Sequence, residues 1–293
     1  MLYVHRTDQG IFISDPHDSP EALRPCAVEW DAIFRADDPI AMLENAAGAE
    51  TAGTSTAGKS QPGVTAERGA RPLVERQEVW AAGVTYFRSR TARMEESETA
   101  GGGSFYDRVY EAARPELFFK GNARTVVAPG APVRIRADAT WNVPEPELVL
   151  AANAAGRIIG FTAGNDVSSR DIEGENPLYL PQAKVYDGSC ALGPVLVLSE
   201  TLPDRSTAIR LEISRDGSVA FAGETTLAEL KRDPEELVSY LFRDQSFPEG
   251  CYLMTGTGIV PDDSFTLRPG DEVSISIGDL APLINTVEQG GSV

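Results

Sequence analysis

Short apolar segments separated by glycine and proline dominate the chain from Val79 onward, and this pattern predicts many β-strands. The Asp216-Gly217 pair between two such segments is typical of a hairpin turn. We expect strands in the segments VWAAGVTYF, LFFK, PVRIR, ELVLAA, IIGFTAG, PVLVL, AIRLEIS, SVAFAG, CYLMTG and EVSISIG. The pattern favours a mainly β, α+β architecture over a doubly wound sheet.

Two helices are expected among these strands. Asp233-Pro234-Glu235-Glu236 combines an N-cap acid, a proline at the first helical position and an acid three residues after the cap. A helix should therefore begin there and continue through LVSYLFRDQ. A shorter helix fits YDRVYEAA, residues 106–113.

The first 75 residues differ in texture and predict a small N-terminal domain. Strand-like pieces, LYVHR and GIFIS, and a helix-like AMLENAAG precede a run rich in alanine, glycine, threonine and serine at residues 47–72. Such a composition predicts a flexible loop or linker. The second domain is expected to span residues 76–293.

The charge balance restricts the partners of the protein. A net charge of −18 argues against nucleic acid and anionic membranes. Cys26, Cys190 and Cys251 are odd in number and form no CxxC pair, so we expect free thiols in a reducing compartment. The start of the chain lacks a secretory signal pattern and no segment is apolar enough to span a membrane, which makes the cytoplasm the expected location.

Three carboxylates form the most informative feature. Glu145 and Glu147 lie two residues apart, so they point to one face if this segment is a strand. The apolar stretches that follow are separated by a turn-like segment, residues 153–156. An antiparallel hairpin around it would pair residue 147 near residue 162 and return Asp166 beside Glu145. A slip of one residue would move Asp166 to the other face.

Like charges on one face repel and need neutralisation. A hard divalent cation such as Mg²⁺, Mn²⁺ or Ca²⁺ would provide it through carboxylate oxygen ligands. A solvated polar strand face or a set of surface ion pairs is the alternative. A second ambiguous feature is the segment between Thr85 and Phe105 with its three glycines, which is either a surface loop or a mobile lid with a glycine hinge.

Several motifs, in order and spacing, resemble the fumarylacetoacetate hydrolase superfamily over about residues 79–287. They are WAAGVTYFRSR, RPELFFK, PEPELV, GFTAGNDVSSRD, QAKVYD, GP, TGTG and RPGDEVSISIGDLAPLINTV. YDRVYEAARPELFFK and DIEGENPLYLPQAK are still more similar to the branch of 2-keto-3-deoxy-D-arabinonate dehydratases and their sugar-acid relatives. The resemblance implies a mixed β-sandwich roll, bound Mg²⁺ and a homodimer or homotetramer.

The resemblance also implies roles for individual residues. It carries the metal ligands onto Glu145, Glu147 and Asp166, an active-site lysine onto Lys184, and an active-site threonine onto Thr257. Glu116 of the RPE motif is expected to act on the substrate. Further expected substrate contacts are Arg88, Ser89, Arg90, Lys120 and Gln182.

Each of these roles has an ordinary alternative. Burial among the LFF residues would raise the pKa of Glu116 toward neutrality and suit it to proton transfer, whereas an exposed glutamate at a strand start would not be catalytic. Lys184 either holds substrate oxygens or forms a structural ion pair with the carboxylates. Lys120 is expected to support the carboxylates or a fold contact, the lid arginines are as readily solvated, and Thr257 can serve a structural turn.

One departure from the family separates two activities. Many hydrolytic members carry a lid histidine that activates water, but here Ser89 or a neighbour occupies that position, and the only histidines are His5 and His17. We therefore expect Mg²⁺-dependent dehydration of a 2-keto-3-deoxy sugar acid, such as 2-keto-3-deoxy-D-arabinonate or xylonate, to 2,5-dioxopentanoate. Hydrolysis of an acylpyruvate, decarboxylation of an oxaloacetate-like acid, or ligand binding without catalysis are the alternatives.

Overall fold

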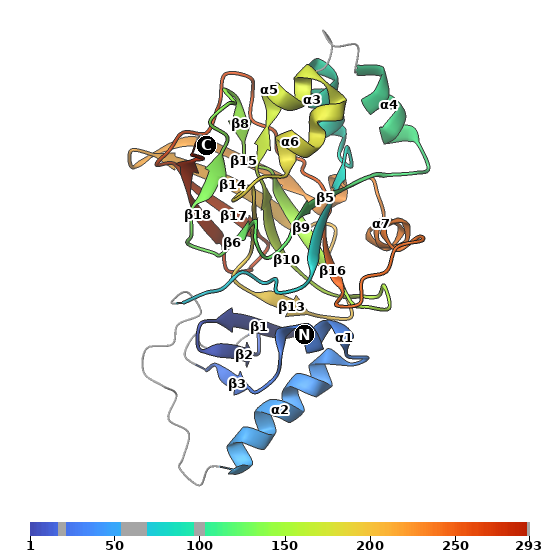
Figure 1. Ribbon diagram of the computed structural model, residues 1–293, viewed down its shortest axis with the longest axis vertical. Helices are drawn as coiled ribbons and strands as arrows, with labels where there is room; N and C mark the ends of the chain where they lie inside the picture. Colours follow the sequence, from blue (N-terminus) through green and yellow to red (C-terminus); the bar gives the residue numbers. More distant parts are fainter. Residues whose placement is uncertain (17–21, 54–68, 97–102, 292–293) are drawn as a thin grey trace.

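The computed structural model describes residues 1–16, 22–53, 69–96 and 103–291. The chain is mainly β, as the strand pattern predicts, and its helices lie around the outside of two sheets (Figure 1). None of the helices within these ranges has the length and apolar character needed to cross a membrane.

The larger sheet is mixed and runs in the order β3-β2-β1-β13-β10-β9-β16-β4-β5, with β12 paired to β10 and β6 paired to β12. Its central strands are buried on both faces, which explains their continuous apolar sequences. Its strands are β1 (Leu2–Thr7), β2 (Gly10–Ser14), β3 (Arg24–Cys26), β4 (Glu78–Gly83), β5 (Glu116–Gly121), β6 (Val126–Val127), β9 (Pro146–Ala152), β10 (Ile158–Asp166), β12 (Cys190–Leu192), β13 (Leu196–Leu198) and β16 (Cys251–Met254).

The smaller sheet packs against the larger one. Leu150 and Leu253 of the larger sheet share a buried cluster with Leu211 and Ile275 of the smaller sheet, so the two form a sandwich. Its strands, in spatial order, are β15 (Ser218–Thr226), β14 (Ala208–Arg215), β17 (Glu272–Ile277), β18 (Leu283–Gln289) and β7 (Val133–Ile135), and a short pair joins β8 (Asn142–Val143) to β11 (Ser168–Ser169). The predicted hairpin turn is confirmed, because Asp216 and Gly217 adopt φ of 51° and 74° between β14 and β15.

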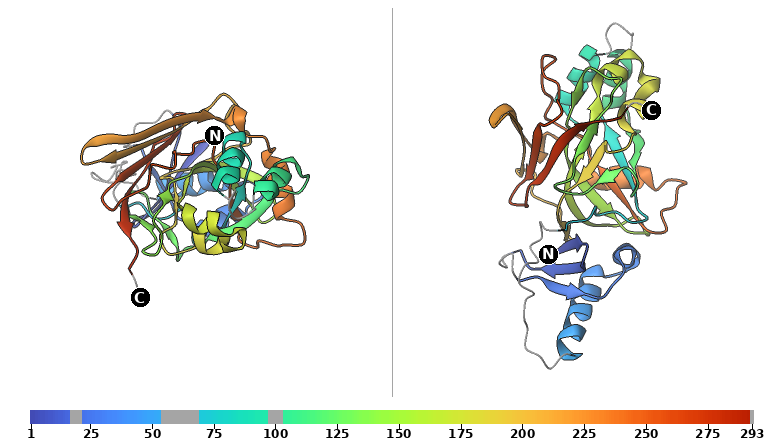
Figure 2. Two further views of the ribbon diagram at one scale, coloured as in Figure 1. Left: turned by 90° about the horizontal axis from the view of Figure 1, so that it is seen from above. Right: turned by 60° about the vertical axis from the view of Figure 1, so that its left-hand side comes forward.

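The N-terminal elements extend the larger sheet. β1 pairs with β13, and Trp30 of α1 (Trp30–Arg35) shares a buried cluster with Tyr252 of β16. Figure 2 shows these elements at the end of the molecule opposite α3 and α5. Helix α2 (Pro39–Gly53) continues into the predicted linker, and residues 54–68 lie outside the described part. A domain boundary near residue 75 stays a prediction.

The β9–β10 hairpin brings the carboxylates together in a register that differs from the predicted one. Glu147 pairs with Gly164, so the expectation that it pairs near Thr162 is wrong. A bulge between Ile158 and Gly160 accounts for part of the shift. Because the total shift is two residues, the side chains keep their faces, and Asp166 still returns beside Glu145.

Helices occupy much of the segment between Thr85 and Phe105, for which the sequence leaves open a surface loop or a mobile lid. Residues Phe87–Glu96 form α3 and Gly103–Glu111 form α4, while residues 97–102, with two of the three glycines, lie outside the described part. Arginine, alanine, methionine and glutamate favour helix in α3, which explains the difference from the predicted loop. The predicted helix at 106–113 is confirmed, but it both starts and ends earlier, at Gly103 and Glu111. The remaining helices are α5 (Arg170–Glu175), η1 (Pro177–Tyr179), α6 (Leu180–Lys184), η2 (Leu227–Glu229) and α7 (Pro234–Leu241).

Helix α7 begins as its sequence predicts. The Asp233 side chain accepts a hydrogen bond from the backbone N–H of Glu236 at 3.1 Å, and Pro234 occupies the first turn.

Candidate active site

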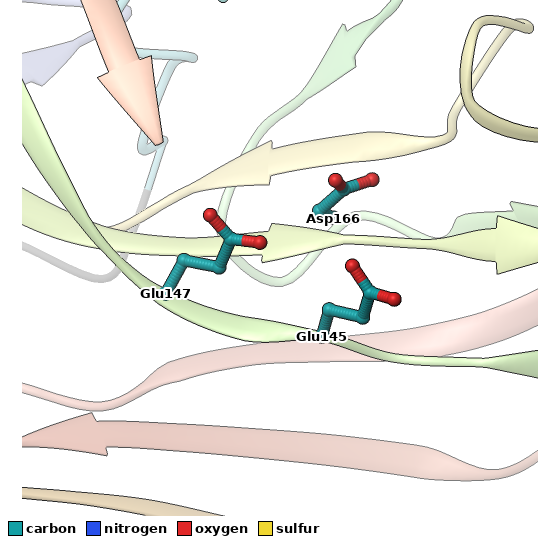
Figure 3. A group of neighbouring side chains, drawn as sticks. All are labelled: Glu145, Glu147 and Asp166. Atoms are coloured by element: carbon teal, nitrogen blue, oxygen red, sulfur yellow. The ribbon is translucent and has the colours of Figure 1, made fainter. Parts of the chain in front are cut away.

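Three buried carboxylates meet where β9 and β10 of the larger sheet pair. Glu145 directly precedes β9, Glu147 lies within β9, and Asp166 ends β10. The backbone N–H of Asp166 donates to the carbonyl oxygen of Glu145 at 3.0 Å, which holds the two strands in register at this point. One side-chain oxygen from each residue lies within 4.8 Å of the others, and the three groups face a common space (Figure 3).

Cations of the chain surround this group of carboxylates. Lys184 Nζ lies 2.5 Å from Glu145 Oε2 and 3.1 Å from Asp166 Oδ2. Lys120 Nζ lies 2.5 Å from Asp166 Oδ1, and Arg170 Nη2 lies 2.8 Å from Glu145 Oε1. All three cations are buried, so these pairs are protected from solvent screening. The chain therefore provides part of the neutralisation that the sequence analysis assigned to a metal.

Glu147 has a different environment from its two neighbours. Its Oε2 accepts a hydrogen bond from the backbone N–H of Gly256 at 2.5 Å. Burial, followed by the negative charges of Asp166 and Glu145, raises the pKa of Glu147 well above its ordinary value, although Lys184 acts in the opposite direction. A divalent cation would favour the ionised carboxylate at this position. Three convergent carboxylate oxygens fit a hard cation such as Mg²⁺.

A pocket opens onto the carboxylates, and Ser89 of α3 is part of its lining. Besides the three acids and Lys184, its lining consists of Ala82, Gly83, Val84, Ser89, Phe118, Gly256 and Thr257. The lining residues 82–84 and 256–257 lie far apart in the sequence. The parallel pairing of β16 with β4 brings the ends of these two strands together. A small anion in this pocket would contact backbone groups at one side and buried charges at the other.

The predicted substrate contacts are placed in different environments. Ser89 and Thr257 line the pocket, and each also stabilises its own turn: Ser89 Oγ donates to the carbonyl of Tyr86 at 2.8 Å, and Thr257 Oγ1 accepts from the N–H of Ile259 at 3.1 Å. Arg88 and Gln182 are exposed and do not line the pocket. The side chain of Arg90 lies outside the described residues. The substrate-binding roles of all five residues stay predictions.

Lys120 supports the carboxylates from behind. Its side chain is fully buried and does not line the pocket, and its ammonium group also donates to the carbonyls of Val167, at 3.1 Å, and Lys184, at 2.5 Å. These contacts agree with the expectation of a supporting role and give no sign of direct substrate contact.

Glu116 begins β5, on the strand face that also presents Phe118 to the pocket. Its side chain is half-buried, and its Oε2 is shielded from solvent. In the β4–β5 ladder it stands opposite Gly83, which lines the pocket. This arrangement places the carboxyl group next to the rim of the pocket, where proton transfer to a bound molecule is possible.

Two site residues were not found from the sequence. Arg170 directly follows the GNDVSS segment. Nothing in this local sequence indicates that Arg170 forms a buried ion pair with Glu145. Tyr86 is fully buried, and burial, followed by the charge of Glu147, raises the pKa of its phenol, which keeps it protonated. The position of Tyr86 in the motif WAAGVTYFRSR was the feature of the sequence that could have identified it as a site residue.

Comparisons with known proteins agree with the motifs. The family described as fumarylacetoacetate (FAA) hydrolase C-terminal matches residues 88–288. The chain is 46% identical over 222 residues to the Haloferax volcanii protein named "Probable 2-keto-3-deoxyxylonate dehydratase", covering 75% of each. It is 41% identical over 218 residues to the 2-dehydro-3-deoxy-D-arabinonate dehydratase of Saccharolobus solfataricus, covering 74% of this chain and 73% of the other.

A solved structure resembles the whole chain. It is 2-keto-3-deoxy-D-arabinonate dehydratase complexed with magnesium and 2,5-dioxopentanoate, with a TM-score of 0.79, 30% identity and full coverage of both chains. The fold and the family predicted from the sequence motifs are thereby confirmed.

Proposed function

The chain belongs to the fumarylacetoacetate hydrolase family, and we propose that it catalyses the Mg²⁺-dependent dehydration of a 2-keto-3-deoxypentonate, of the arabinonate or xylonate type, to 2,5-dioxopentanoate. The observation that carries this proposal is the identity of 46% and 41%, over three quarters of the chain, to two dehydratases of such sugar acids. The buried acids, Lys184 and Glu116 support the same chemistry.

The metal would be held by Glu145, Glu147 and Asp166, whose oxygens converge as a hard cation requires. When bound, Mg²⁺ supplies a Lewis acid that polarises the C2 keto group and makes the C3 protons more acidic. Mn²⁺ and Ca²⁺ are expected to occupy the same ligands.

The groups around the pocket would bind and orient the substrate. Lys184 presents a buried ammonium group beside Glu145 and Asp166, where it attracts the oxygens of a bound keto acid. Thr257 lies at the pocket wall, in the segment that follows β16, and would offer a polar group to the substrate carboxylate. Lys120 and Arg170 fix the acids, so these acids do not have to reorganise during the reaction.

Glu116 would transfer the protons. Its carboxylate removes a proton from C3, and the resulting carboxylic acid protonates the C4 hydroxyl, whose C–O bond breaks to release water. The unsaturated keto acid that is left loses one proton from C5 and the proton of the C5 hydroxyl, and C3 and C4 each gain one proton, which gives the C5 aldehyde. The phenol of Tyr86, held protonated by its surroundings, does not compete as a base.

A hydrolytic activity of the histidine-dependent kind has less support. Ser89 stands in the pocket at the lid position. His5 lies in β1, where its Nε2 is 3.0 Å from Ser14 Oγ, and His17 lies outside the described residues. Loss of CO₂ from an oxaloacetate-like acid needs only the metal and is the second candidate.

One assay tests the proposal directly. The purified protein is incubated with 2-keto-3-deoxypentonate and Mg²⁺, and 2,5-dioxopentanoate is measured. Formation of this product, and its loss when EDTA is added, is the expected result. Absence of product together with cleavage of an acylpyruvate or release of CO₂ from oxaloacetate would refute it.

We also propose a cytoplasmic homo-oligomer, a dimer or tetramer. In the described structure Cys190 and Cys251 are buried and form no disulfide, which is the state expected of thiols in a reducing compartment.

A further inference from the structure

Gly83 and Glu116 stand opposite each other where β4 and β5 pair. Gly83 is the last residue of β4 and lines the pocket beside the three acids. Glu116 is the first residue of β5 and the proposed proton-transfer group. The absence of a side chain at residue 83 therefore falls at the point where the pocket meets this carboxyl group.

The backbone does not explain the glycine. Gly83 does not adopt the positive φ that favours glycine, in contrast to the pocket residue Gly256, whose φ is 91°. An alanine at 83 would fit the strand conformation. The reason for glycine must lie in what surrounds it.

The neighbouring space is filled by Glu116. A Cβ added at residue 83 would lie 2.6 Å from Glu116 Cδ and 3.3 Å from Glu116 Cγ, and it would overlap with Glu116 Oε2. These atoms of Glu116 are the three nearest that the added Cβ would meet. The carboxyl group thus lies directly against the Cα of Gly83, in the space that any other residue would fill.

We propose that Gly83 is a positioning residue, which acts through Glu116 by leaving room for its carboxyl group at the rim of the pocket. The inference rests on the proposed function for its catalytic consequence, although the steric relationship stands without it. Gly83 itself touches no reacting atom in this scheme. Its contribution is the place in which the carboxyl group is held.

Gly83→Ala separates this role from a role in folding. The overlapping atoms belong to the far end of a flexible side chain, so Glu116 can rotate away at small cost while the strands stay paired. We expect the variant to fold and to bind Mg²⁺ as the wild type does. Its kcat should fall by about 100-fold or more, which is the usual contribution of a positioned acid or base, while KM changes little.

A double-mutant cycle tests whether the effect passes through Glu116. The set consists of Gly83→Ala, Glu116→Ala and the double variant, assayed with 2-keto-3-deoxypentonate and Mg²⁺. In the Glu116→Ala background, Gly83→Ala should cause no further loss of kcat. An equal loss in both backgrounds would overturn the proposal. Gly48→Ala is the matched control, because nothing lies within 4 Å of a Cβ added there, and it should keep wild-type kcat.

A crystal structure of Gly83→Ala provides a readout that does not depend on the activity. The Glu116 carboxyl group should move away from residue 83 while the Lys184–Glu145 pair stays in place. An unmoved carboxyl group would overturn the inference. If the wild type forms no 2,5-dioxopentanoate, the proposed function fails, and this structure still decides the steric claim.

Discussion

Lys184 Nζ lies 2.5 Å from Glu145 Oε2, so a cation of the chain contacts one of the proposed metal ligands. The same ammonium group contacts Asp166 at 3.1 Å, and the whole arrangement is buried. A buried charge pair is costly to break, because removal of one partner leaves the other uncompensated. We therefore expect Lys184 to link the stability of the site to the binding of the proposed metal.

Lys184→Met should destabilise the metal-free protein by roughly 3 kcal/mol or more, as the loss of one partner of a buried pair does. Saturating Mg²⁺ should restore more stability to this variant than it adds to the wild type, since the acids lack a competing cation. Urea unfolding with EDTA and with Mg²⁺ measures both effects. Arg210→Gln, which breaks an exposed pair with Glu224, should cost less than about 1 kcal/mol. Equal Mg²⁺ stabilisation of variant and wild type would contradict the prediction.

Glu147→Gln should weaken Mg²⁺ binding while the fold is kept. The amide oxygen can still accept the hydrogen bond from Gly256 N–H, and the variant resembles the protonated acid that the raised pKa favours without metal. Its thermal stability in EDTA should therefore equal or exceed that of the wild type. Isothermal titration with Mg²⁺ should show an affinity at least about 10-fold weaker, as loss of a charged ligand implies. Unchanged affinity would refute the assignment of Glu147 as a ligand.

The local pattern predicted the convergence of the acids, and the limits of that prediction have physical causes. The alternation of Glu145 and Glu147 and the turn at 153–156 imply a hairpin, and this hairpin is present. The bulge between Ile158 and Gly160 has no signature in the apolar pattern, so the register could not be predicted. The side chains point to the predicted faces because the register shift is an even number of residues.

Contacts between distant segments were beyond prediction from local pattern. The pairing of β1 with β13 joins residues nearly 200 positions apart. Hydrophobic alternation along a strand does not specify which other strand it pairs with. Arg170 reaches Glu145 only because α5 starts beside the end of β10. The need for glycine at 83 likewise arises from Glu116, a residue of another strand, and not from its own backbone.

Arg232→Gln should loosen the end of α4 that leads into β5. The buried guanidinium donates to the carbonyls of Val109, Ala112 and Ala113, at 3.0, 2.6 and 3.1 Å, at the end of a helix, where carbonyl groups lack the regular intrahelical hydrogen bond. The expected loss of unfolding free energy is about 1–3 kcal/mol. Because β5 begins with Glu116, kcat should fall as well.

Arg243→Gln is the control for this change. Arg243 is exposed and stacks over the ring of Tyr240 at 3.5 Å, so its removal should cost less than about 1 kcal/mol and leave kcat unchanged. Thermal melts and steady-state kinetics on both variants decide the matter. A variant at 232 that is as stable and active as the variant at 243 would show that α4 does not depend on Arg232.

His5 should make the protein sensitive to mild acid. Burial lowers the pKa of His5 from 6.5 to about 4, so the unfolded chain binds a proton at a pH where the folded chain does not. The stabilisation from His5 is complete above pH 6.5 and is lost as the pH falls toward 4. Between pH 7.5 and 5 the loss amounts to about 2 kcal/mol.

Glutamine at position 5 isolates this contribution, because it does not titrate and keeps a polar group near Ser14, the partner of the His5 ring. Acidic side chains contribute equally to both proteins, so the difference in unfolding free energy between wild type and His5→Gln reports on His5 alone. That difference, measured by urea denaturation at several pH values, should shift by about 2 kcal/mol in favour of the variant from pH 7.5 to 5. A difference that is independent of pH would mean that the imidazole is protonated equally well in the folded and unfolded chains, contrary to its burial in β1.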